Sequence, residues 1–384
     1  SQNIPWTGGS LFLETSAQRM DLFSEHKYSW QTSPIMIGYR QSLFGYNSLK
    51  WDKRIEPVRY QEAKKSYVET LELVSANAIN KFFALATAQS NYDIASFNYA
   101  NADTLYRYAQ GRYNIGTITE NEMLQLELNR LTEETNRMNA RIEMDNCMQE
   151  LRSYLGIQEE REIRVRVSSR IPDFSINLNE ALALAYENSP DIQTMKRRKL
   201  ESESAVARAR ANAGLKADIY LRFGLTQTAD KLPEAYRNLL DQQYVSLSIS
   251  LPILDWGRGK GQVRVARSNR DLVYTQVEQN RTDFELNVRK LVKQFNLQTQ
   301  RVRIAARTDE TAQRRNEVAR KLYILGKSTI LDLNASISEK DSARRNYVSA
   351  LYNYWSLYYT LRSMTLYDFE SNKLLTEDYN LLIE

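Results

Sequence analysis

Apolar and polar residues alternate along four short stretches of the chain. The clearest stretch is residues 245–253, in which valine, leucine and isoleucine alternate mainly with serine. A period of two is typical of a β-strand with one apolar face. Weaker alternation is found in three further stretches, residues 11–13, 35–43 and 219–225. The polar segments near 15–33 and 227–243 are predicted to be loops, which gives two hairpins with strands of about nine residues.

A long segment without the helix-breaking residues glycine and proline follows each pair of strands. The chain has only 13 Gly and 7 Pro, and neither occurs between Val58 and Gln110 or between Gln262 and Leu325. As one helix, the second segment would be roughly 95 Å long. Small or apolar residues recur every seven positions, which is the signature of a coiled coil. The lines are Val277, Phe284, Leu291, Gln298, Ala305, Ala312 and Ala319, then Val288, Phe295 and Val302, and in the first segment Ala88, Ala95, Ala102 and Ala109.

Each long segment is predicted to end in a turn from which a helix returns. Gly116 and Gly326 suit the left-handed position that follows a helix. Thr119 and Thr329 each precede an acid by three residues, which is the spacing of a capping box. The returning helices run to Gly156 and to about residue 366, so the pattern predicts two long antiparallel helical hairpins.

The whole arrangement is repeated at an offset of 210 residues. Leu151-Arg152-Ser153 recurs as Leu361-Arg362-Ser363, and Tyr113, Gly116, Thr119 and Glu122 recur as Tyr323, Gly326, Thr329 and Asp332. The second repeat opens with a predicted helix over residues 178–213 that has no counterpart in the first. We therefore expect the native protein to be longer at its N-terminus; alternatively, the first repeat never had this helix.

Composition excludes several kinds of chemistry. The 52 basic and 47 acidic residues are well mixed, so no basic block indicates nucleic acid. The single Cys147 cannot form an internal disulfide, and the single His26 argues against histidine-based metal or triad chemistry. We interpret His26 as a surface residue and Cys147 as a packed one. The glycines of residues 257–261 lack the spacing of a dinucleotide loop, so no cofactor is expected.

The strands leave two interpretations open. Four strands cannot close a pore, and open sheet edges are not tolerated in lipid, so a membrane role requires several copies of the chain. The alternative is a pair of hairpins packed on a soluble core.

Three features together resemble the TolC-like outer-membrane efflux family over nearly the whole chain. They are the doubled strand–strand–hairpin unit, the strand-to-helix segment Leu251-Pro252-Ile253-Leu254-Asp255-Trp256-Gly257, and the tip pattern Tyr323-x-x-Gly326-x-x-Thr329-x-x-Asp332. The opening helix at residues 178–185, followed by Asn188-Ser189-Pro190, is also similar to that of the family.

The resemblance implies a mostly α fold with a transmembrane β part. Internally duplicated helical hairpins would form an α-barrel, and four strands per chain would contribute to a trimeric 12-strand β-barrel. The implied parts are outer-membrane strands at 9–46 and 217–256, a periplasmic helical barrel at 57–157, 178–213 and 262–366, and equatorial linkers at 158–177 and 367–384.

The implied function is an outer-membrane channel-tunnel of a tripartite efflux or type I secretion system, not an enzyme. It would be a homotrimer in the outer-membrane lipid of a Gram-negative bacterium, with its helices in the periplasm. A periplasmic membrane-fusion adaptor and an inner-membrane pump of the RND, ABC or MFS type would be its partners. The alternative is a periplasmic or surface coiled-coil protein.

The resemblance also implies functional residues at the tips. Glu122 and Tyr323 align with positions that lock the closed tip, and Asp332 aligns with a carboxylate that rings the pore. Ser328 and Ala335 stand where the family's gate has an arginine and an acid. Helix capping is the alternative role for Glu122 and Asp332. The implied adaptor contacts are Ile115, Gly116, Thr117, Leu325, Gly326 and Lys327.

Overall fold

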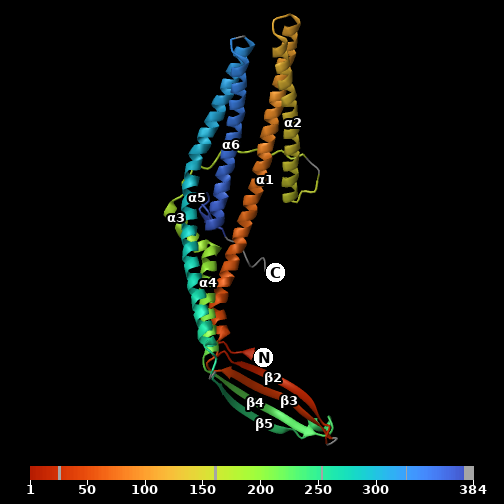
Figure 1. The fold of residues 1–384 in the computed structure, drawn as a ribbon, viewed down its shortest axis with the longest axis vertical. Coiled ribbons are helices and arrows are strands. Elements are labelled where there is room, and N and C mark those ends of the chain that lie inside the picture. Colours follow the sequence, from red (N-terminus) through yellow and green to blue (C-terminus); the bar gives the residue numbers. More distant parts are fainter. Residues whose placement is uncertain (25–26, 160–161, 252–253, 326, 376–384) are drawn as a thin grey trace. The chain divides into compact units, whose positions relative to one another are not determined.

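The computed structural model describes residues 1–384 except 25–26, 160–161, 252–253, 326 and 376–384. The described chain divides into two compact units (Figure 1). The first comprises Ser1–Lys64 and Pro190–Asp283, and the second comprises Lys65–Ser189 and Phe284–Glu384. Helices α1 (Ser48–Asn114) and α5 (Arg258–Ile324) have 67 residues each and contribute to both units.

The first unit contains a single antiparallel sheet. Its strands lie in the order β1-β2-β3-β4-β5, so the two predicted hairpins are joined edge to edge through β3 and β4. The strands are β1 (Gln2–Asn3), β2 (Ser10–Leu22), β3 (Lys27–Ser42), β4 (Lys216–Ala229) and β5 (Leu240–Ser250).

The four main strands are longer than the sequence predicts. They have 13, 16, 14 and 11 residues. The predicted loop near 15–33 is wrong because most of that segment is strand, whereas the predicted loop near 227–243 is shortened to residues 230–239 between β4 and β5. Backbone pairing continues where side chains on both faces are polar, as in the partners Gln18 and Gln31. Pro34 lies beside a register shift between Thr32 and Ile35, and such bulges tolerate the missing N–H of proline.

The two faces of the sheet differ sharply in polarity. Residues at alternate positions of all four strands form one exposed apolar face, on which Leu13 and Val245 are 72% and 70% exposed. Its members are Leu11, Leu13, Ile35, Ile37, Tyr39, Ile219, Leu221, Phe223, Leu225, Val245, Leu247 and Ile249. The opposite face, which we call the polar face, includes Ser10, Arg40, Ser42, Asp218, Arg222, Ser246 and Ser248.

Within the first unit, ion pairs join helix α4 (Pro190–Ala213) to the beginnings of α1 and α5. Arg197 Nε lies 2.6 Å from Glu62 Oε2, and Lys199 Nζ lies 3.0 Å from Glu278 Oε1. The predicted helix over 178–213 is divided, because α3 (Leu178–Asn188) ends before Ser189 and Pro190 starts α4. Proline suits the first position of a helix, where its missing N–H has no partner to lose.

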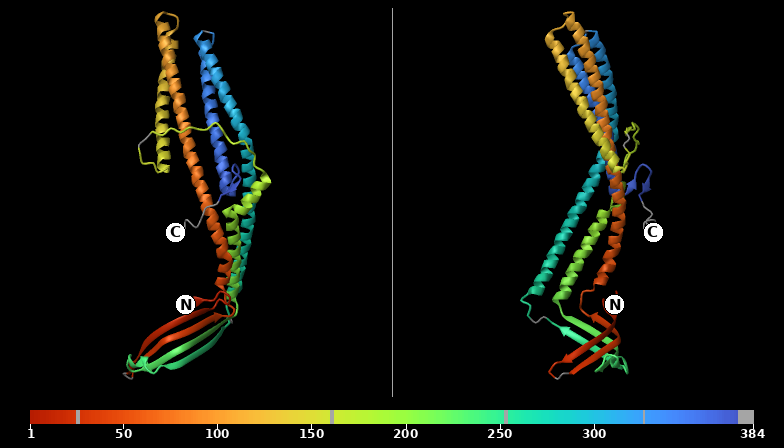
Figure 2. Two further views of the ribbon diagram at one scale, coloured as in Figure 1. Left: turned by 180° about the vertical axis from the view of Figure 1, so that it is seen from behind. Right: turned by 90° about the vertical axis from the view of Figure 1, so that its right-hand side faces the viewer.

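The second unit contains a row of four helices in the order α5, α6, α1 and α2 (Figure 2). Helix α2 (Glu120–Tyr154) packs on α1 and α6 (Ile330–Thr365) packs on α5. Contacts join each neighbouring pair: Asp309 with Arg344 at 3.1 Å, the rings of Phe83 and Tyr352 at 5.6 Å, and Lys81 with Glu150 at 2.8 Å.

The predicted heptad lines form the core of this row. Phe295 is fully buried and packs against the rings of Tyr354 and Phe174 at 5.1 and 5.4 Å. The four alanines of the first repeat, Ala88, Ala95, Ala102 and Ala109, are all buried. Seven-residue spacing therefore identifies the inward faces of α1 and α5.

Element boundaries differ from prediction at the helix starts. Helix α1 begins at Ser48 rather than residue 57 and contains Pro57, which is exposed; α5 begins four residues before the predicted 262. The described part of 158–177 has no helix or strand, and α6 is followed by the short strands β6 (Tyr367–Asp368) and β7 (Lys373–Leu374).

Candidate functional site

The turn between α1 and α2 has the predicted left-handed glycine. Gly116 has φ of +75°, and its N–H donates to the carbonyl of Tyr113 at 2.9 Å. The N–H of Thr117 donates to the carbonyl of Arg112 at 2.9 Å, so the last carbonyls of α1 are satisfied. In the second turn Lys327 N–H donates equivalently to Leu322, whereas Gly326 lies outside the described residues.

Both predicted capping boxes are present. Thr119 N–H donates to Glu122 Oε2 at 3.0 Å, and Glu122 N–H donates to Thr119 Oγ1 at 3.3 Å. The second box makes the same exchange between Thr329 and Asp332, with Ser328 Oγ donating to Asp332 Oδ2 at 3.3 Å. Glu122 and Asp332 therefore both start the returning helices.

These hydrogen bonds also fix the charge state of Asp332. The Thr329 hydroxyl, which lies 2.7 Å from Asp332 Oδ2, is the main cause of a lowered pKa of this carboxyl group. The backbone N–H of Thr329 and the Ser328 hydroxyl lower the pKa further. Asp332 is thus held as an anion on the exposed surface of the tip.

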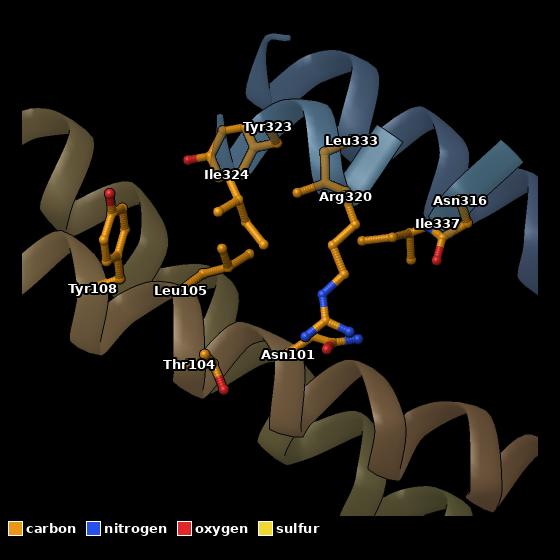
Figure 3. A pocket seen from close by; sticks show the side chains of 10 residues that line it. All are labelled: Asn101, Thr104, Leu105, Tyr108, Asn316, Arg320, Tyr323, Ile324, Leu333 and Ile337. Atoms are coloured by element: carbon orange, nitrogen blue, oxygen red, sulfur yellow. The ribbon is translucent and has the colours of Figure 1, made fainter. Parts of the chain in front are cut away.

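A cavity of about 200 Å³ lies between α1 and the α5–α6 hairpin, close to the turns. Figure 3 shows Tyr323 and Arg320 of α5 projecting toward α1, where Leu105, Tyr108 and Asn101 line the other side. Most of the lining is apolar. The cavity therefore places Tyr323 at the contact between the two hairpins.

The electrostatics of Tyr323 connect it with the first tip. Burial raises the pKa of its phenol, Arg112 lowers that pKa through its charge, and Glu122 raises it through its charge. Residues of the first hairpin thus act on Tyr323 of the second hairpin. Of the three predicted gate residues, Glu122 and Asp332 both take part in helix caps, and the charge of Glu122 also acts on the phenol of Tyr323.

The surface of both tips is apolar. Ile115 is 74% exposed and Leu325 is 67% exposed, and Leu331 beside the second turn is also exposed. An isolated exposed leucine needs no explanation, but a cluster on a protruding turn is typical of a contact surface.

A polar seam, which the sequence analysis missed, joins the hairpins below the cavity. Asn98 Nδ2 of α1 donates to Asp341 Oδ2 of α6 at 2.7 Å, and Lys340 Nζ lies 3.2 Å from Asp341 Oδ1. Asn316 of α5 donates to Ser336 Oγ at 3.0 Å. Asp341, Asn316 and Ser336 are buried, so these pairs tie α6 to both neighbours within the core.

The described residues contain no group of three or more histidine, cysteine or acidic residues placed to hold a metal ion. In the same residues no helix is both long and apolar enough to cross a membrane.

The second repeat carries a recognisable family pattern. Residues 181–365 match the family described as "Outer membrane efflux protein". The second repeat of the chain therefore carries the pattern of the outer membrane efflux protein family. The match covers the end of α3, all of α4, both strands of the second hairpin and the α5–α6 hairpin.

Solved channels share the fold of this chain at low sequence identity. The Campylobacter jejuni CmeC outer membrane channel is 15% identical, with a TM-score of 0.76 over 99% of this chain and 81% of that one. The Vibrio cholerae outer membrane protein VceC is 15% identical, with a TM-score of 0.72 over 93% and 86%. The open state of the Neisseria gonorrhoeae MtrE outer membrane channel is 13% identical, with a TM-score of 0.73 over 97% and 83%. No curated protein matches the sequence.

One feature of the sequence does indicate the cavity and the seam. The second heptad line, Val288, Phe295 and Val302, continues at the same spacing through Asp309 and Asn316 to Tyr323. Extending the line would have predicted that Asp309 and Asn316 are buried and that Tyr323 faces the neighbouring hairpin. Their partners on α1 and α6 follow only from the packing of the helices.

Proposed function

We propose that three copies of this chain form a passive export duct through the outer membrane of a Gram-negative bacterium. The duct is recruited by a periplasmic membrane-fusion adaptor and an inner-membrane pump of the RND, ABC or MFS type, as in tripartite efflux or type I secretion. The observation that carries this proposal is the sheet, whose apolar face is exposed and whose outer edges are unpaired within one chain.

The apolar face supports insertion into lipid. Side chains that alternate between a lipid-facing apolar row and a polar row are the pattern of transmembrane β-barrels. The four main strands have 11 to 16 residues, enough for a tilted strand to span a bilayer. The short β1 pairs with β2 only at Ser10 and Leu11, so the rest of the β2 edge and the β5 edge are free. Because lipid offers no hydrogen bonds, these free edges must pair with other copies, and three copies give the proposed 12-strand barrel.

The helical row has matching free edges. Helix α2 lies at one end of the row and exposes Leu124, Leu128, Leu131, Met138 and Ile142 at heptad spacing. Helix α5 lies at the other end and exposes Leu297, Ile304 and Val318, again seven residues apart or a multiple of seven. When one edge of a subunit binds a different edge of the next subunit, the copies form a closed ring if the repeated rotation returns to the first copy. We infer that α2 of one copy packs on α5 of the next.

The tips are assigned the gate and the adaptor contact. Tyr323, at the contact of the two hairpins, and Glu122, in the cap of α2, are proposed to hold the tip closed, and Asp332 is proposed to present its charge to the pore. The residues proposed to dock the adaptor are Ile115, Gly116, Thr117, Leu325, Gly326 and Lys327. The helical segments would then lie in the periplasm, and residues 158–177 and 367–384 would form the equatorial part.

The test is single-channel recording of the full-length trimer in a planar bilayer. A large conductance, together with a trimer that survives detergent and dissociates on heating, is expected. A monodisperse, detergent-independent coiled coil without conductance would instead support the alternative of a periplasmic or surface structural protein.

A further inference from the structure

Two arginines and three aromatic residues gather on the polar face of the sheet, toward the end at which β2 begins and β3 finishes. The strand register defines one row containing Phe12, Gly38, Arg222 and Tyr244, and the adjacent row contains Ser10, Arg40, Tyr220 and Ser246. We call Phe12, Arg40, Tyr220, Arg222 and Tyr244 the arginine–aromatic band. The band crosses the four main strands from one edge of the sheet to the other.

The members of the band hold one another in place. The ring of Tyr220 stacks on Phe12 at 5.7 Å and meets Tyr244 edge-on at 5.9 Å, and the Arg40 guanidinium lies 5.6 Å from the Tyr220 ring centroid. Gly38 makes room for this packing, because a Cβ at that position would come within 2.0 Å of Phe12 Cζ. The rings therefore form an ordered aromatic surface beside the arginines.

The band carries positive charge without an acidic partner. Among the described residues, no carboxylate forms an ion pair with Arg40 or Arg222. Arg222 Nη2 donates to Gln242 Oε1 at 3.3 Å, and its Nε is buried without a hydrogen-bond partner. The acids of this face, Glu14 and Asp218, lie in the rows to either side, about 7 Å away along the strands.

We propose that the arginine–aromatic band binds aromatic anions, such as aromatic carboxylates or sulfonates, inside the barrel. The inference rests on the proposed function, since the polar face lines a lumen only when several copies close the barrel. Each copy then supplies two guanidinium groups that donate to an oxyanion and three rings that stack on the ligand. A band of this kind selects, among molecules passing through the duct, those that carry both a negative charge and a ring.

The test is current block of the full-length trimer in a planar bilayer, with naphthalene trisulfonate added at the mouth of the barrel. Wild-type channels are expected to be blocked. The double change Arg40→Gln with Arg222→Gln should raise the half-blocking concentration at least about tenfold, since charged hydrogen bonds are lost. Arg19→Gln is the matched control, because its register partners Trp30 and Ala229 place it on the other face, and it should leave the block unchanged.

A second variant separates stacking from charge. Tyr220→Leu should weaken the block by naphthalene trisulfonate severalfold while leaving the block by pyrophosphate, which has no ring, unchanged. The proposal that the band binds aromatic anions is refuted if wild-type channels conduct but are not blocked by naphthalene trisulfonate. It is also refuted if the double arginine variant is blocked as strongly as wild type, or if Arg19→Gln weakens the block as much as the double variant does. Absence of conductance in the wild type refutes the duct itself and is seen before any probe is added.

Discussion

The pair Asn98–Asp341 offers the sharpest test of how the two helical hairpins are held together. Asp341 is 5% exposed, and its Oδ2 accepts the amide hydrogen of Asn98 at 2.7 Å across the contact between α1 and α6. Asn98→Asp changes one N–H donor into an oxygen with almost no change in volume. Two carboxylates then face each other in the core, while the packing around them stays the same.

The expected penalty follows from the distance and the burial. At an effective dielectric constant of 20, two unit charges 3–4 Å apart repel by about 4–6 kcal/mol. The pair can relieve this by taking up one proton, and protonating an aspartate with a reference pKa of about 3.9 costs about 4 kcal/mol at pH 7. We therefore expect Asn98→Asp to lower the free energy of unfolding by about 2–4 kcal/mol at pH 7.

The sign of the pH dependence is fixed by the same reasoning. In the variant the folded pair binds a proton more tightly than the unfolded chain, so its pKa is raised on folding. The deficit relative to wild type should therefore be small near pH 4 and grow as the pH rises toward 7. Thermal unfolding followed by helical circular dichroism, with variant and wild type compared at each pH, measures this difference.

The exchanged pair is the control. Asn98→Asp combined with Asp341→Asn restores one amide donor opposite one carboxylate and should recover stability to within about 1 kcal/mol. A single variant as stable as wild type at pH 7, or a deficit that does not change with pH, would refute the contact as described.

Four further changes test other parts of the molecule. Phe295→Ala should lower the free energy of unfolding by about 3–5 kcal/mol, and a loss below 1 kcal/mol in thermal unfolding would contradict its core position. Gly38→Val should weaken the heat-labile trimer on gels, with rescue by Phe12→Ala; no rescue would argue against the ring contact. Thr329→Ala should cost about 1 kcal/mol and Thr329→Ser almost nothing, so equal effects would exclude the cap. Asp332→Asn should reduce block of the channel by cations, and because the pKa of Asp332 is lowered, wild-type block should persist at about pH 5; unchanged block removes Asp332 from the pore.

The helical half of the fold could be predicted from sequence because its signals are local and periodic. The heptad lines through Phe295 and Ala95 identify buried faces, and the spacing of Thr119 and Glu122 predicts a box that involves only neighbouring residues. The turn at Gly116 is equally local, since its conformation is set by one residue.

The strand ends and the polar seam could not be predicted in the same way. Where both faces of a strand are polar, as at Gln18, the backbone ladder continues but the period of two disappears. The partnership of Asn98 with Asp341 joins residues 243 positions apart and depends on the relative height of two helices. Tyr323 could be predicted as a gate residue only through the family resemblance, and its cavity became visible only with the packed hairpins.

The free edges of the sheet have a genetic consequence. In a three-copy ring each chain completes both of its neighbours, so a defect in β5 of one copy leaves the β2 edge of the next unpaired. Co-expression of wild-type chains with an equal amount of an edge-defective variant would leave only about one-eighth of the rings wholly wild type. Mutations at these edges should therefore be dominant, whereas mutations confined to the surface of a single helix should be recessive.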